Sequence, residues 1–195
     1  MATIEEITKQ IEADPANAQF EAEGQKPLFQ APATARINII GQTPGDKAEE
    51  HHRVWDDRSG ERLREWLDVD EDTFYNSGMF ALLPLDFYFT GHDFHGAIDP
   101  RPDFAPKWFP EIIKTMPDIQ LTILAGGDAI DYFLHPNYKE DETEVVKNYQ
   151  EYLPKYFPII HPSGHNNIWL VEHPWFEQDV IPALRKHVHA ILDEK

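Results

Sequence analysis

The sequence predicts an α/β fold in three layers, αβα, with a central, mostly parallel, four-stranded sheet. Two observations indicate this class. Short apolar runs suited to buried strands recur along the chain, and segments with the three-and-four spacing of amphipathic helices lie between them. Strands that alternate with helices form parallel sheets whose two faces are covered by helices. Ligands of such sheets bind at the carboxyl ends of the strands.

Length and composition fit one globular domain. The chain has 195 residues, of which 41% are hydrophobic and 12% aromatic, so we read residues 1–195 as a single domain with a full core. Residues 1–35 are expected to form an N-terminal helix and a meandering connection, and residues 36–192 the α/β core. The sequence contains no apolar run of membrane-spanning length and no signal-like N-terminus. A cytoplasmic monomer without a membrane partner is expected.

Charge and cysteine content exclude several classes of site. Cysteine is absent, which excludes disulfides, thiolate nucleophiles, cysteine-ligated zinc and iron–sulfur clusters held by thiolates. The 17 basic and 35 acidic residues give a formal net charge of -18. Affinity for nucleic acids depends largely on neutralising phosphates, so this charge repels polyanions at long range. Contacts with DNA are therefore expected to be local.

The first elements follow from spacing and capping. A helix is predicted over residues 3–13, with Thr3 and Glu6 placed as a capping box. Scattered Pro and Gly predict a connection over residues 14–35. A buried strand is predicted at residues 37–40 and ends in a glycine turn at 41–45. After an acidic loop, a helix is expected at residues 59–67, with Ser59 as its N-cap.

The later elements continue the same alternation. A long loop, rich in aromatic residues, follows the second strand, and loops of that length in compact domains are usually functional or disordered. The predicted order is a strand at 79–83 stopped by Pro84, the long loop at 85–107, a helix at 108–116, a strand at 121–125, helices at 128–134 and 142–152, a strand at 156–160, a loop at 161–166 and a helix at 174–192.

Two loops follow strands that are expected to be parallel. The turn Gly41-Gln42-Thr43-Pro44-Gly45 lets backbone amides approach a ligand closely, because glycine adds no side chain. His161, which begins the loop at 161–166, can donate a hydrogen bond to a developing oxyanion. The two loops are expected to meet at one edge of the sheet. Each feature alone is also compatible with a purely structural role, and the turn matches neither the dinucleotide nor the P-loop fingerprint.

A family resemblance lies in these same loops. The glycine turn is followed by Trp55 and by Arg58-Ser59-Gly60-Glu61-Arg62-Leu63, and the second loop begins His161-Pro162-Ser163. The combination resembles the two motifs of the uracil-DNA glycosylase superfamily, in the form of its Gly-Glu-Ala-Pro-Gly branch, over residues 36–192. Phe74-Tyr75 and Trp169-Leu170 are further similarities, to short bacterial proteins of that superfamily.

The resemblance implies a uracil-DNA glycosylase-like fold and hydrolysis of the N-glycosidic bond of uracil or another deaminated base in DNA, as in base excision repair, with no cofactor and no metal. Gln42 and the amides from Gly41 to Gly45 would contact the base, and Trp55 would stack on it. His161 would stabilise the departing base anion. The loop that carries Ser163 and Asn166 would press into the duplex.

The chain departs from the family pattern at several positions. Thr43 stands where other branches have a carboxylate or an Asn, and a hydroxyl can orient water but cannot take its proton. The base-reading Asn at the end of the second strand has no counterpart, and Asp86 is the nearest polar residue. Gly164-His165 occupies the position of a Leu or Arg wedge. The nearby carboxylates considered as substitutes for Thr43 are Asp46, Glu49, Glu50 and Asp57.

Two other functions stay open. One is a non-catalytic member of the same fold that binds a nucleotide, a free base or a protein partner. The other is a metal-dependent hydrolase that uses His92, His95 and nearby carboxylates. His51-His52 is a second histidine pair that can be read as metal ligands. Basic residues available for phosphate contacts are Arg58, Arg62, Arg64, Arg101 and Lys107.

Overall fold

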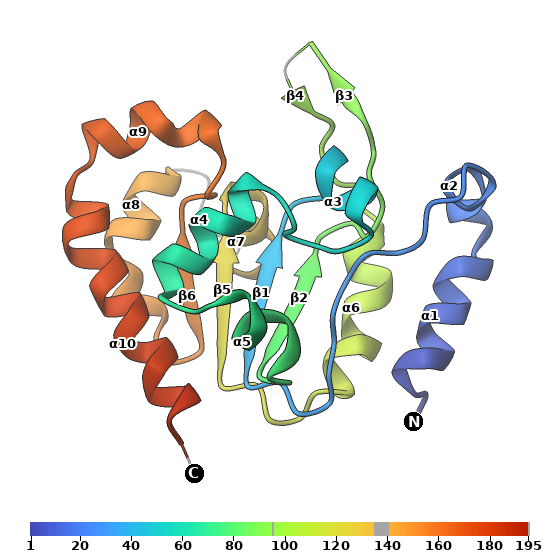
Figure 1. Cartoon of the computed structure of the whole chain (residues 1–195), viewed down its shortest axis with the longest axis horizontal. Helices are drawn as coiled ribbons and strands as arrows, with labels where there is room; N and C mark the ends of the chain where they lie inside the picture. The colour runs from blue at the N-terminus through green and yellow to red at the C-terminus, as the bar shows by residue number, and fades with distance from the viewer. Residues whose placement is uncertain (95, 135–140, 195) are drawn as a thin grey trace.

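The computed structural model describes residues 1–94, 96–134 and 141–194, and its centre is a four-stranded sheet (Figure 1). The strands are β1 (Ile37–Gly41), β2 (Phe80–Pro84), β5 (Leu121–Ala125) and β6 (Tyr156–Ile159), in the order β2-β1-β5-β6. All three pairings are parallel. The predicted three-layer α/β class and its four strands are confirmed.

Helices cover both faces of the sheet. In Figure 1, α4 (Arg58–Leu67) and α5 (Glu71–Asn76) lie in front of it, and α6 (Phe104–Lys114) and α7 (Gly127–Leu134) lie behind it. Helix α10 (Ile181–Leu192) packs against α4, and α1 (Ile4–Ala13) against α6. Strands β1, β2 and β5 are buried along their whole length, as expected for strands with helices on both sides.

The remaining elements are short. They are the 3₁₀ turns Pro15–Asn17, Tyr149–Tyr152 and Gly164–Asn166, the helices α2 (Ala18–Ala22), α3 (Asp46–His51), α8 (Glu142–Lys147) and α9 (Asn167–Glu172), the strands β3 (His92–Asp93) and β4 (Gly96–Ala97), and a π-helical turn at Phe176–Val180. Within the described ranges, no helix is long and apolar enough to cross a membrane.

The predicted capping box of α1 is present. The amide of Glu6 donates to Thr3 Oγ1 at 3.2 Å, and the amide of Thr3 donates to Glu6 Oε2 at 3.0 Å. Ile7 and Ile11 are buried on the inner face of this helix. Local capping and apolar spacing therefore sufficed to place α1.

Several predicted boundaries were wrong. Helix α4 is capped by Asp57 rather than Ser59, since Asp57 Oδ1 accepts the amide of Gly60 at 2.8 Å. The segment predicted as an acidic loop contains α3, and α6 begins at Phe104, one turn before the predicted start, with Phe104 and Ala105 buried. Pro84 is the last residue of β2, paired in register with Gly41, rather than a stop outside the strand.

Other segments contain more structure than the sequence predicted. Residues 14–35 include α2, the long loop at 85–107 includes β3 and β4, and α5 and α9 were not predicted. The helix predicted at 142–152 is split into α8 and a 3₁₀ turn, and the one at 174–192 into a π-helical turn and α10. These are short or irregular elements, which apolar periodicity identifies poorly.

Candidate active site

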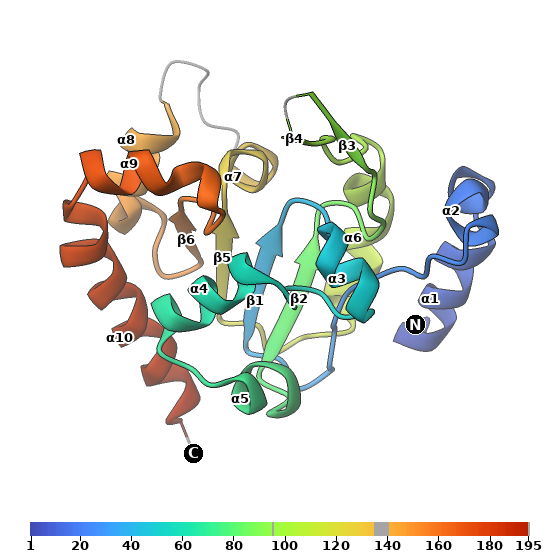
Figure 2. The same ribbon diagram turned by 45° about the horizontal axis from the view of Figure 1, so that its top comes forward.

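A cavity of about 920 Å³ opens at the carboxyl ends of β1, β2 and β6. Figure 2 shows α9 on one side of this edge of the sheet and the β3–β4 hairpin on the other. All of the predicted site residues line the cavity, namely Gly41, Gln42, Thr43, Gly45, Trp55, His161, Ser163 and Asn166. The two loops, far apart in sequence, are therefore neighbours in space, as parallel strand order requires.

Trp55 forms a wall of the cavity because two glycines make room for it. A side-chain carbon at Gly41 would lie 2.9 Å from the ring of Trp55, and one at Gly60 would lie 1.7 Å from its carbonyl oxygen. That carbonyl also accepts a hydrogen bond from Arg64 at 3.1 Å. The ring is 7% exposed, and its centroid lies 5.5 Å from that of His161. Trp55 is thus fixed by α4 and by the end of β1.

The backbone of Trp55 is in an uncommon conformation. Its φ is 63°, in the left-handed region that few residues other than glycine adopt. The preceding carbonyl, of Val54, accepts a hydrogen bond from the hydroxyl of Tyr75 at 2.8 Å. The buried Nε1 of Trp55 has no hydrogen-bond partner within the described part of the chain. Strain and an unsatisfied donor at one residue are typical of functional sites.

His161 is held as a neutral imidazole of one tautomer. Burial, with a contribution from nearby His165, lowers its pKa to about 4, so it is uncharged at neutral pH. The amide of Ser163 donates to Nδ1 of His161 at 3.2 Å. Because Nδ1 accepts, the single ring proton of the neutral form resides on Nε2. His161 therefore keeps an N–H donor that the backbone does not use.

The loop that begins at His161 is tied at both ends. Asn166 donates its side-chain amide to the carbonyl of His161 at 2.8 Å. Arg62, on α4, donates to the carbonyl of Ser163 at 3.3 Å. The predicted site residues Ser163 and Asn166 thus shape the loop and orient the imidazole, in addition to lining the cavity.

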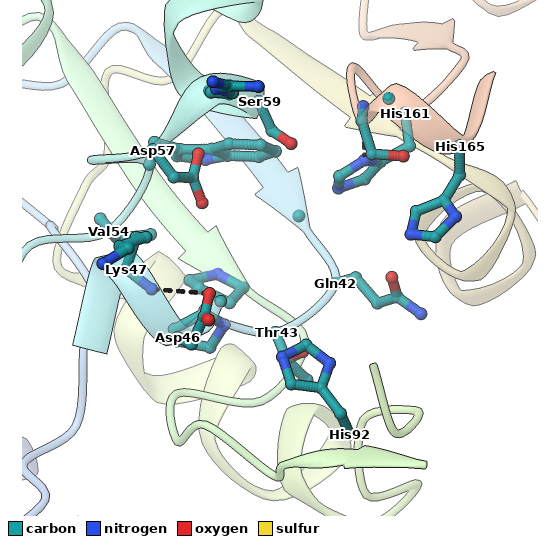
Figure 3. Close-up of a pocket in the computed structure, with 18 of the residues that line it drawn as sticks. Gln42, Thr43, Asp46, Lys47, Val54, Asp57, Ser59, His92, His161 and His165 are labelled. Atoms are coloured by element: carbon teal, nitrogen blue, oxygen red, sulfur yellow. Dashed lines mark hydrogen bonds between the residues drawn. The ribbon is translucent and has the colours of Figure 1, made fainter. Parts of the chain in front are cut away.

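The side chain of Gln42 extends from the glycine turn toward α7. Its Nε2 donates to Oδ2 of Asp128 at 2.9 Å. Figure 3 shows Gln42 extending from the end of β1 on the side where His161 and His165 lie. Thr43 follows it in the cavity lining.

A family model described as the uracil DNA glycosylase superfamily matches residues 28–185. The chain belongs to this superfamily. The matched range begins before β1 and contains both loops of the cavity, and it supports a DNA glycosylase-like function in general. The resemblance to this superfamily that the two sequence motifs indicated is confirmed.

Among the carboxylates considered as substitutes for Thr43, Asp57 lies in the cavity lining and faces the glycine turn. Asp57 lines the cavity and uses Oδ1 to cap α4. Its Oδ2 lies 3.4 Å from the position of a side-chain carbon at Gly45, so it faces the glycine turn. Burial raises the pKa of the Asp57 carboxyl. A carboxylate with a raised pKa is a better proton acceptor.

The other three carboxylates have partners on α3 or lie outside the cavity lining. Asp46 lines the cavity and accepts the amide of Lys47 at the start of α3. Glu50 is paired with Lys47 at 2.7 Å. Burial raises the pKa of Glu49, whose Oε2 is buried without a partner in the described structure, but Glu49 does not line the cavity.

The expected phosphate-binding residues are mostly engaged within the protein. Arg62 binds the carbonyl of Ser163 and Arg64 binds that of Trp55, as described above. Arg101 binds Asp86, and Lys107 binds Asp14. Arg58 is the member of this set that lines the cavity.

The cavity lining is acidic on balance, with Asp46, Asp57, Asp93 and Asp99 against Lys47 and Arg58. Asp93, Asp99, Lys47 and Ile98 were not predicted as site residues. Asp93 lies in β3, and Ile98 and Asp99 directly follow β4. This segment has no apolar period that would have distinguished it from the rest of the long loop.

The histidines considered as metal ligands are dispersed. His92 lines the cavity and its ring packs against Phe89, with centroids 5.3 Å apart. His51 Nδ1 lies 3.3 Å from Oδ2 of Asp56. His95 lies outside the described residues. Among those that are described, no three His, Asp or Glu side chains come together as a metal site.

Proposed function

We propose that this protein hydrolyses the N-glycosidic bond of uracil or another deaminated base in DNA. The observation that supports this proposal most is His161: a neutral imidazole at the cavity, with its proton on Nε2. When the base departs, negative charge develops on its carbonyl oxygens. A preorganised N–H donor at that point lowers the barrier without a change of protonation state.

Other residues around the cavity have roles in activating water, holding the base and contacting DNA. Water attacks C1′ of the sugar, the bond from C1′ to the base nitrogen breaks, and its electron pair leaves with the base. Thr43 orients the water, and the carboxylate of Asp57 takes its proton. The base lies against Trp55, in the space that Gly41 leaves open. DNA contacts are local and involve Arg58.

A second candidate function is binding of a free base or nucleoside without cleavage. The acidic cavity lining favours it, because four aspartates oppose two cations where a phosphate backbone would approach. In that case uracil raises the melting temperature of the protein, Trp55→Ala abolishes the rise, and no base is released from DNA.

The test is base release from single- and double-stranded oligonucleotides that contain uracil, hypoxanthine or xanthine, at enzyme excess. His161→Ala is expected to slow release by about 10²–10³-fold, the effect of losing an oxyanion donor. Asp57→Asn keeps a good N-cap for α4 and is expected to slow release by about 10²-fold or more.

Matched controls exist for both variants. His52→Asn changes an exposed histidine outside the cavity lining, at a left-handed backbone position that Asn tolerates. Asp70→Asn changes the N-cap of α5, whose Oδ1 accepts the amide of Thr73 at 2.7 Å. Both are expected to release base at the wild-type rate. No release by the wild-type protein from any substrate rejects the enzymatic proposal.

A further inference from the structure

The polar side chain nearest the end of β2 is not available to a ligand in the cavity. Asp86, the polar residue nearest the end of β2, is fully buried. Its Oδ1 accepts from the amide of Tyr88 and from Arg101, at 3.2 and 2.9 Å. Its Oδ2 accepts from the amide and Nε of Arg101, at 3.2 and 2.7 Å. With both oxygens occupied, Asp86 serves the core and has no acceptor left for a ligand.

Gln42 is an amide with a fixed orientation at the cavity. An ionised carboxylate only accepts hydrogen bonds, so the bond to Asp128 Oδ2 at 2.9 Å requires the NH₂ group of Gln42 to face Asp128. The carbonyl oxygen, Oε1, is then on the other side of the amide. In Figure 3 it is turned to the side of His161 and His165. Gln42 thus offers the cavity a hydrogen-bond acceptor.

His161 offers the complementary donor. Its Nε2–H is available because Nδ1 accepts from the backbone of Ser163. A lactam edge, in which a ring N–H stands beside a carbonyl, presents one donor and one acceptor. Uracil, hypoxanthine and xanthine have such an edge, and so do thymine and guanine. Cytosine and adenine have a bare ring nitrogen beside an amino group, which reverses the pattern.

We propose that Asp128 is a positioning residue that locks the amide of Gln42, so that Gln42 Oε1 and His161 Nε2–H together select bases with a lactam edge. This inference rests on the proposed function, because it assumes that the cavity receives a base. Asp128 does not line the cavity and acts through Gln42. It lies at the start of α7, directly after β5, so the sheet fixes its distance from the turn that follows β1.

The experiment measures binding of free uracil and free cytosine by calorimetry, which requires no bond cleavage. The wild-type protein is expected to prefer uracil by about tenfold, the value of one net hydrogen bond. In Asp128→Asn the new amide can donate or accept, so Gln42 can turn over and donate to the ring nitrogen of cytosine. Cytosine affinity should therefore rise relative to uracil, and the preference should fall below about threefold. Structural damage alone would weaken both bases together.

Asp131→Asn is the matched control. Asp131 is an exposed carboxylate on the same helix, within electrostatic reach of Asp128, and its loss should leave the preference near tenfold. The inference is overturned if wild-type protein binds both bases equally or neither, if Asp128→Asn keeps the preference, or if Asp131→Asn removes it as well. Selective uracil binding without base release from DNA supports the inference and contradicts the proposed enzymatic function.

Discussion

Glu142 gives a prediction whose sign and size follow from the structure. Its carboxyl lies beside Gly127, 3.5 Å from the position of a side-chain carbon there. Burial, followed by the charges of Asp128, Asp131 and Asp141, raises the pKa of Glu142 to about 7 from its ordinary value of 4.5. The folded protein therefore holds a proton that the unfolded chain has released between these two pH values.

The stability contribution of Glu142 is lost as the pH rises. A raised pKa in the folded state makes folding most favourable at low pH and less favourable as the pH approaches 7. The difference of 7 − 4.5 = 2.5 pKa units corresponds to at most about 3 kcal/mol, and less to the extent that solvent screens a side chain that is only partly buried. Glu142→Gln cannot ionise, so it should be more stable than the wild-type protein at pH 8, and within about 1 kcal/mol of it at pH 5.

Urea unfolding at pH 5 and pH 8 measures this difference. All other titrating groups are the same in the variant and the wild-type protein. The change with pH in the difference between their free energies of unfolding therefore reports on Glu142 alone. Glu144→Gln, at an exposed position of the same helix, is the control and should show a pH-independent difference. A stability difference between Glu142→Gln and wild type that is the same at both pH values refutes the reasoning.

Three further predictions concern the surroundings of the cavity. Gly60→Ala should lower the free energy of unfolding by about 3 kcal/mol, because the new methyl would overlap the Trp55 carbonyl; an effect below about 1 kcal/mol in urea unfolding contradicts this packing. Asp86→Asn should cost about 3–5 kcal/mol, since it removes the charge that neutralises Arg101, and a stability equal to wild type would show that the ion pair is not needed. The ¹⁵N signals of His161 should remain those of a neutral ring protonated on Nε2 from pH 5.5 to 8, given its pKa of about 4; titration near pH 6.5 would contradict the assignment.

The sheet and the meeting of the two loops could be predicted because both depend on local signals. Buried strands can be recognised in a sequence as short apolar runs. The carboxyl ends of parallel strands lie at the same edge of the sheet. The strand that precedes Gly41 and the one that precedes His161 are examples. The sequence does not give the register of their pairing with β5, but it does predict that both end at the same edge of the sheet.

The partners of individual polar residues could not be predicted. Asp57 and Ser59 are both good N-caps at neighbouring positions, and only the backbone path decides that Asp57 caps α4. The pairs Gln42–Asp128 and Asp86–Arg101 join segments whose relative placement depends on the assembled sheet and on the long loop. No spacing rule in the sequence connects them.

Single-turnover release of uracil from an oligonucleotide tests the central claim most directly, with wild-type protein and His161→Ala compared at the same enzyme excess. The account predicts measurable release by the wild-type protein and a rate about 10²–10³-fold lower for the variant. Equal rates for the two proteins would contradict the role assigned to the neutral imidazole at the mouth of the cavity.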